Sequence, residues 1–187
     1  MAIRYAQGRS RILSETLGSP ALGSTTAVHA AVTDTGSPQT VTTAITDPAV
    51  CRNITATAGG TAGDIKAIQV VVTGTNIYDE VISETLPAFT VDTAGTVVGS
   101  KAFKTVTSIT IPAHDGTGAT TAIGTGAKLG LPARLLRNTV VYAFLADVRE
   151  GTAPTVATSS TAVESNTVSL NSALNGSEVT VDFYKGV

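Results

Sequence analysis

The sequence predicts an all-β protein built as a β-sandwich, with an extended N-terminal arm and a C-terminal β-hairpin extension or small β lobe. Runs rich in Thr, Val and Ile recur along the chain, and β-branched side chains favour the pleated surface of a sheet. Clusters of Gly, Pro, Asn and Asp separate these runs about every eight to twelve residues, which is typical of a sandwich or barrel. Only residues 133–150 have apolar spacing that suits a helix, and the β-branched run within them favours a strand.

The composition excludes several classes of protein. The chain has 187 residues and a mass of 18.8 kDa, which is enough for one domain with a substantial core. Hydrophobic residues make up 42%, which excludes a disordered chain, and no apolar run reaches the roughly 18 residues of a membrane helix. Charged residues make up only 14%, against about 25% in typical soluble proteins. The net charge of −2 argues against general nucleic-acid binding, because binding to a duplex depends largely on neutralising phosphates, and we expect no specific nucleic-acid partner.

Residues 1–25 are the predicted arm. Its arginines precede the first acidic residue, Glu15. One helical turn is possible over residues 9–15, and Gly18 and Pro20 in the Gly/Ser/Pro stretch at 17–24 would end it. Such a segment is either a frayed terminus or a tether that lies along a partner. Its apolar residues are too many for a purely solvated tail. If it is a tether, the candidate partner-binding residues are Arg4, Tyr5, Arg9, Arg11, Ile12 and Leu13.

The main β-sandwich is predicted over residues 26–130. Loops of residues that tolerate positive φ separate several of its strands, as at 34–38 and 58–64. The dipeptide Asp115-Gly116 is a hairpin signal, because it suits the primed turns that match the twist of paired strands. The expected strands are 26–33, 39–46, 52–57, 65–74, 80–87, 105–111 and 120–124.

The alternation of apolar and polar residues predicts how some of these strands face. Residues 65–72 become continuously apolar, which is typical of a strand buried on both faces. In residues 80–86 two glutamates share a face with an isoleucine, which indicates a partly exposed strand or the edge of a sheet. In residues 105–111 the apolar parity changes near Ser108, and this change predicts a β-bulge.

Residues 131–187 follow a break at Gly130-Leu131-Pro132. They contain a second hairpin signal, Asn175-Gly176. Their strands either complete the sandwich or form a small β lobe, and the sequence leaves both arrangements open. The expected strands are 138–147, 155–159, 162–170 and 177–184.

No motif for catalysis, cofactor binding or metal binding stands out, so we expect no enzyme, no cofactor and no metal site. Cys51, His29 and His114 lie at no zinc-binding spacing, and the acidic residues near Glu80 look like a charged strand face rather than a calcium loop. His114 beside Asp115 is not accompanied by a nucleophile elbow, so we interpret the pair as turn chemistry.

The glycine-rich stretches at 116–118 and 124–130 match neither the dinucleotide-binding nor the P-loop pattern. Their glycines are expected to allow tight turns at strand ends. A single cysteine excludes an intrachain disulfide, and the opening residues lack the apolar segment of a signal peptide. We therefore expect the chain to be made and folded in a cytoplasm.

Several stretches resemble virion structural proteins of tailed bacteriophages. They are turn and strand sequences rather than catalytic motifs, and they cover most of residues 50–187 while leaving the arm unmatched. The stretches are NITATAGGTAGDI at 53–65, VTGTN at 72–76, EVISET at 80–85, GSKAFKTV at 99–106, IPAHDGTGA at 111–119, APT at 153–155 and LNSALNG at 170–176. The resemblance implies an Ig-like β-sandwich of the capsid decoration or neck and tail accessory type, located in the virion after assembly in the host cytoplasm.

Within that class, the first hypothesis is an auxiliary protein that binds and stabilises the assembled capsid. Arginines of the arm would pair with carboxylates of the major capsid protein or another virion protein. A neck, collar or tail-tube component is the alternative, in which exposed strand edges close a ring by self-association. A host-surface or carbohydrate-binding module is a third hypothesis, although sugar sites usually need stacking aromatics and only 4% of this chain is aromatic.

Overall fold

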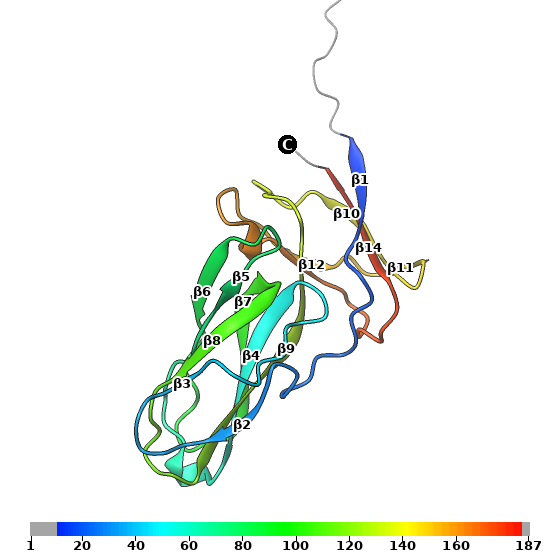
Figure 1. Cartoon of the computed structure of the whole chain (residues 1–187). Helices are drawn as coiled ribbons and strands as arrows, with labels where there is room; N and C mark the ends of the chain where they lie inside the picture. The colour runs from blue at the N-terminus through cyan, green and yellow to red at the C-terminus, as the bar shows by residue number, and fades with distance from the viewer. Residues whose placement is uncertain (1–10, 185–187) are drawn as a thin grey trace, which may run out of the picture.

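The computed structural model describes residues 11–184 and confirms the all-β class (Figure 1). The strands lie in three antiparallel sheets, and the helical content of this part of the chain is limited to 3₁₀ turns at Ala62–Asp64 and Val163–Ser165. The strands are β1 (Ile12–Thr16), β2 (His29–Thr33), β3 (Gln39–Val41), β4 (Arg52–Gly60), β5 (Val71–Thr75), β6 (Val81–Thr85), β7 (Gly95–Phe103), β8 (Thr105–Ile111), β9 (Ala119–Gly130), β10 (Val140–Leu145), β11 (Val148–Arg149), β12 (Thr155–Ala157), β13 (Thr167–Ser169) and β14 (Val179–Tyr184).

Two of the sheets face each other, and we call this body the main sandwich. One sheet has the order β12-β13-β9-β4-β7, with β2 also paired to β9, and the other has the order β3-β8-β5-β6. Both sheets contribute to one hydrophobic core, for example Ile54 from β4 and Ile109 from β8, each fully buried. Burial of such aliphatic side chains is the main stabilising contribution to a body of this kind.

The third sheet has the order β1-β14-β10-β11, and we call it the C-terminal sheet. Alternate residues of β14 point into a second core, which includes Val181 and Phe183. Strand β9 connects the two cores, because its Ile123 belongs to the first and its Leu129 to the second. Figure 1 shows β9 running from the main sandwich toward the C-terminal sheet.

Each arrangement left open for residues 131–187 describes part of that segment. Strands β12 and β13 extend the main sandwich through β9, whereas β10, β11 and β14 build the C-terminal sheet together with β1. The helical turn considered near Glu15 is wrong, because residues 12–16 form a strand paired along its whole length with β14. The pairing supplies backbone hydrogen bonds that a short isolated turn would lack.

The two hairpin signals are wrong, because each connects strands of different sheets. Asp115-Gly116 lies between β8 and β9, and Asn175-Gly176 lies between β13 and β14. The tight hairpin of the structure is instead β10–β11, whose turn residues Ala146 and Asp147 both have positive φ. Alanine seldom adopts this conformation, so the sequence carried no signal for it.

Of the three predictions made from the alternation of apolar and polar residues, two are confirmed and one is wrong. Strand β6 lies at the edge of its sheet, and the register of β5 with β8 shifts beside Ser108, so both of these predictions are confirmed. The segment 65–74 becomes a strand only at Val71, and its side chains alternate between buried and partly exposed. The prediction of burial on both faces is wrong, because this sheet packs against the other sheet with one face.

The glycines at 124–130 do not form turns. They lie inside β9, where Gly124 lets the carbonyl of Ser24 approach and Gly126 lets the side chain of Asn53 approach. A Cβ atom at either position would collide with these neighbours. The glycines therefore allow other segments to cross β9 at close range.

Candidate partner-binding surface

Strand β1 carries the described part of the predicted partner-binding segment. Arg4, Tyr5 and Arg9 lie outside the described residues. Leu13 packs against the second core, opposite Phe183 in the register of β1 with β14. Arg11 is exposed just before the strand, and 51% of Ile12 is exposed. The structure thus divides the segment into a partly buried residue that packs on the core, Leu13, and two exposed residues, Arg11 and Ile12.

Beside Ile12 lies the outward face of the C-terminal sheet, which we call the outer face. In β14 and β10 its members alternate with residues that face the second core, as the pleat of a sheet requires. Tyr142 and Phe144 make an edge-to-face contact with ring centroids 6.5 Å apart, and the guanidinium of Arg149 lies 4.0 Å from the centroid of the Tyr142 ring. The outer face comprises Ile12, Tyr142, Phe144, Arg149, Asp182 and Tyr184.

Sequence reasoning named only Ile12 among the members of the outer face. Tyr142 and Phe144 stand two residues apart in a strand, so they share a face, and this period of two was the available signal. Arg149 had no such signal, because its position over Tyr142 depends on the tight turn between β10 and β11. Aromatic residues and arginine are enriched at protein interfaces, which makes this face a candidate for binding a protein.

A shallow hollow of about 80 Å³ adjoins the outer face. Tyr142, Arg149 and Glu150 are among the residues that line it. The carboxylate of Glu150 accepts hydrogen bonds from the backbone N–H groups of Asn171 and Ser172, at 3.0 and 2.9 Å. These bonds hold residues 171 and 172 next to Glu150, so the chain after β13 supports the wall of the hollow at this residue.

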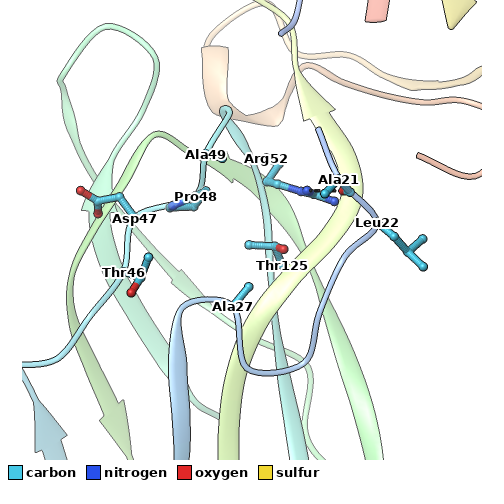
Figure 2. Close-up of a pocket in the computed structure, with 9 residues that line it drawn as sticks. All are labelled: Ala21, Leu22, Ala27, Thr46, Asp47, Pro48, Ala49, Arg52 and Thr125. Carbon is cyan, nitrogen blue, oxygen red and sulfur yellow. Dashed lines mark hydrogen bonds between the residues drawn. The ribbon is translucent and has the colours of Figure 1, made fainter. Parts of the chain in front are cut away.

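The linker from β1 to the main sandwich crosses β4 and β9 at a second hollow, of about 200 Å³ (Figure 2). Arg52, of which only 4% is exposed, holds the linker there. Its guanidinium donates to the carbonyl of Gly126 and, at 2.9 Å, to the carbonyl of Ala21. Burial lowers the pKa of this guanidinium. The side chain of Arg52 thus joins β9 to the linker by hydrogen bonds.

The other charged group lining this hollow, the carboxylate of Asp47, also bonds within the protein. The carboxylate of Asp47 accepts the backbone N–H of Val106 at 2.8 Å. The remaining lining is largely aliphatic and includes Pro48 and Leu22, the latter well exposed. The hollow therefore marks where the linker meets the sandwich, and its two charged groups bond within the fold.

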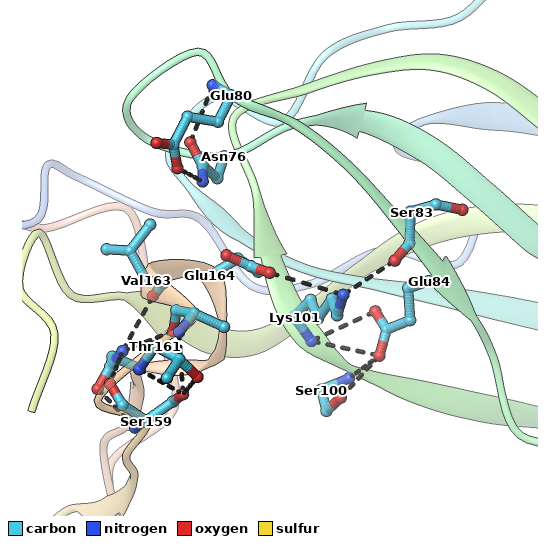
Figure 3. A network of polar contacts seen from close by, with 12 residues as sticks. Asn76, Glu80, Ser83, Glu84, Ser100, Lys101, Ser159, Thr161, Val163 and Glu164 are labelled. Atoms are coloured by element: carbon cyan, nitrogen blue, oxygen red, sulfur yellow. Dashed lines mark hydrogen bonds and ion pairs between the residues drawn. The ribbon is translucent and has the colours of Figure 1, made fainter. Parts of the chain in front are cut away.

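A polar network closes one side of the main sandwich (Figure 3). The buried carboxylate of Glu84 on β6 accepts the backbone N–H of Ser100 at 2.6 Å and its hydroxyl at 2.7 Å. In return, the ammonium of Lys101 on β7 donates to the carbonyl of Ser83 at 3.0 Å and lies 3.6 Å from the carboxylate of Glu164. Side chains of each edge strand thus occupy backbone groups of the other edge, which prevents further strands from adding there.

His114 is a buried structural residue. Its Nδ1 accepts the backbone N–H of Lys66 at 3.2 Å, so Nε2 carries the proton and donates to the hydroxyl of Thr121 at 3.0 Å. Its ring stacks on that of Phe89 with centroids 6.0 Å apart. Desolvation lowers the pKa of His114 against the opposing influence of Asp34 and Asp115. With this tautomer the imidazole has no lone pair available to activate the threonine.

The remaining chemistry-bearing groups give no further site in the described residues. Burial raises the pKa of Cys51 to about 12, so its thiol stays protonated at neutral pH. Residues 11–184 contain no group of three or more His, Cys, Asp or Glu side chains arranged to hold a metal ion. No helix among them has the length and apolarity needed to cross a membrane.

Comparison of the chain with models of known protein families, with curated proteins and with solved structures gives no match. The functional argument therefore depends on the residues themselves. Two features of the C-terminal sheet supply these residues, its outer face and its edge strand β1.

Proposed function

We propose that this chain is a non-enzymatic structural component of a tailed-phage virion, an auxiliary protein that binds and stabilises the assembled capsid. The resemblance of residues 50–187 to virion proteins motivates the class. The observation that carries the role is the outer face, where aromatic rings, Arg149 and Ile12 point away from the core. Faces of this composition suit binding to another protein.

The internal bonding of the polar side chains supports a structural role. The carboxylates of Asp47 and Glu84, the guanidinium of Arg52 and the imidazole of His114 all bond to groups of the protein's own fold. Groups held in this way stiffen a body. A rigid body loses less conformational entropy when it docks, so more of its contact energy contributes to binding.

Stabilisation of the capsid would follow from mass action. A protein that binds the assembled shell and not its free subunits shifts the equilibrium toward the shell, and the shift grows with its concentration. Two arginines of the predicted arm, Arg4 and Arg9, would pair with carboxylates of the major capsid protein or another virion protein. The low charge of the chain, 14% of residues, is tolerable for a subunit held in a large ordered particle.

The test is immunogold labelling of intact particles with an antibody to this chain, followed by binding of truncated protein to particles that lack it. Gold spread over the head is expected. Deleting residues 1–10 is the informative truncation, because it removes Arg4, Tyr5 and Arg9 and leaves β1 intact. We expect this truncation to fold and to bind the particles more weakly. Gold confined to the neck or tail, or on no particle, would refute the capsid role.

Two alternatives have specific observations against them. A tail-tube subunit needs long free strand edges, but the edges of β6 and β7 are tied together by Glu84 and Lys101, and the open edge of β1 is only five residues long. A carbohydrate-binding module usually stacks sugars on exposed aromatic rings, and at the outer face Arg149 already stacks on one face of the Tyr142 ring. These observations favour the capsid-binding role among the three hypotheses.

A further inference from the structure

Strand β1 leaves its outer edge open in the part of the chain that the structure describes. It ends the C-terminal sheet and pairs there with β14 alone. The N–H of Leu17 donates to the carbonyl of Val179 at 2.8 Å, toward β14. Bonding direction alternates along an antiparallel strand, so Leu13 and Glu15 also bond toward β14. The backbone groups that point outward are therefore those of Ile12, Ser14 and Thr16.

The bonds of β14 agree with this alternation. The N–H of Tyr184 donates to the carbonyl of Thr139 at 3.2 Å, on the side of β10. Even-numbered residues of β14 thus bond toward β10, and odd-numbered ones, Val179 among them, bond toward β1. The outer edge of β1 is consequently a row of N–H and C=O groups that a further strand could pair with.

The charges on and beside β1 are complementary to those of a second, antiparallel copy of the same strand. Glu15 lies on the same face of β1 as Leu13, and continuing the alternation by one residue places Arg11 on that face too, two residues before Leu13. Neither Arg11 nor Glu15 forms an ion pair within residues 11–184. If two β1 strands pair antiparallel about a two-fold axis through Leu13, Arg11 of each copy lies opposite Glu15 of the other. A register centred on Ser14 would instead place Glu15 opposite the apolar Leu13.

We propose that the outer edge of β1 binds the same edge of a second copy of this chain, in the register centred on Leu13. Ile12 and Ser14 of opposite copies then exchange backbone hydrogen bonds, and Arg11 and Glu15 form an ion pair at each end. The two C-terminal sheets become one continuous sheet. A two-fold interface must be self-complementary, and this strand meets that requirement in both hydrogen bonding and charge. The inference depends on β1 alone and holds whether or not the proposed function is correct.

Analytical ultracentrifugation of the full chain over a wide concentration range tests the backbone pairing. Wild-type protein is expected to dimerise reversibly. Ser14→Pro removes an outward N–H without removing a bond to β14, so we expect it to weaken dimerisation about tenfold or more. Ser14→Ala keeps that N–H and is the matched control, with an expected change of about twofold or less.

Charge reversal tests the register. Arg11→Glu and Glu15→Arg each place like charges opposite one another, and each is expected to weaken dimerisation about tenfold. The double variant R11E/E15R exchanges the charges and is expected to return to within about threefold of wild type. Unchanged circular dichroism and melting temperature would show that the variants fold.

Three results would overturn the proposal. The first is a wild-type chain that stays monomeric at every concentration. The second is a dimer that neither Ser14→Pro nor Arg11→Glu weakens. The third is a monomer in which the same substitutions abolish binding to phage particles, because that result would assign the edge to a different protein.

Discussion

The main sandwich and the C-terminal sheet are both built from antiparallel strands, but they differ in which faces and edges they bury. In the main sandwich two sheets bury their inner faces against each other, and Glu84 and Lys101 occupy backbone groups along one side. The C-terminal sheet buries one face, while the other presents aromatic rings and Arg149. Its edge strand β1 comes from the opposite end of the chain and has an open outer edge within residues 11–184.

The placement of aromatic side chains shows what this difference means. Phe103 and Phe183 are fully buried, one in each core, where they contribute to stability. Tyr142 and Phe144 instead lie on the outer face, although the chain has few aromatics to spare. Stability alone would favour burying them. Their outward position is consistent with a scaffold in one region and a presented surface in the other.

The largest expected effects come from removing one buried aromatic ring from each core. Phe103→Ala and Phe183→Ala should each lower the free energy of unfolding by about 3–5 kcal/mol, because each leaves a large cavity. If the regions unfold separately, Phe183→Ala exposes the amides of β1, β10 and β14 to hydrogen exchange, whereas those of β4 and β8 stay protected. Phe103→Ala should have the opposite pattern. Equal loss of protection in both regions after either substitution would show a single cooperative unit.

The next effect concerns the linker, which ties the two regions together. A Cβ at position 124 would collide with the carbonyl of Ser24, which accepts the N–H of Thr125 at 3.0 Å. Gly124→Ala should lower the free energy of unfolding by about 1–3 kcal/mol and release this amide to exchange. Gly95→Ala is the matched control, because a Cβ there meets nothing within 4 Å, and it should change stability by about 0.5 kcal/mol or less. Equal effects of the two substitutions would contradict a close crossing at Gly124.

How much of this could be predicted depended on whether local or distant residues determine each element. Strand β8 and its bulge were predicted because β-branched residues alternate within it. Strand β7 was missed because Gly, Ser and Lys interrupt its pattern, and its pairing with β4 makes it a strand. Strand β1 was missed for the same reason, since its partner β14 lies at the other end of the chain.

The candidate surface shows the same limit. The arm residues were chosen for their charge and apolar character. The sequence could not separate the partly buried Leu13 from the exposed Ile12 without the register of β1 on β14. The contribution of Arg149 depends on the turn at Ala146 and Asp147, whose positive φ values follow no sequence rule for alanine.

The smallest expected effect is the pH dependence of stability, which we expect to arise in the main sandwich. Both histidines of the chain, His29 and His114, lie in the main sandwich. Burial lowers the pKa of folded His114 below its ordinary value of 6.5, so the unfolded chain binds more protons there. Stability should therefore be complete above about pH 6.5 and decline as the pH falls below it, by at most about 1.4 kcal/mol per pH unit.

Urea unfolding between about pH 5 and 7.5 measures this slope, over a range chosen to lie above the ordinary pKa of carboxylates. His114→Gln removes the titrating group and should flatten the slope, while His29→Gln leaves the contacts with Lys66 and Thr121 in place and is the matched control. Asp34, Asp115 and Lys66 surround His114, so Asp34→Asn should lower the pKa of His114 further and steepen the decline. Amide exchange at low pH should then increase first in the main sandwich. An earlier loss of amide protection in the C-terminal sheet would contradict this prediction, because acid would then act first on the presented surface.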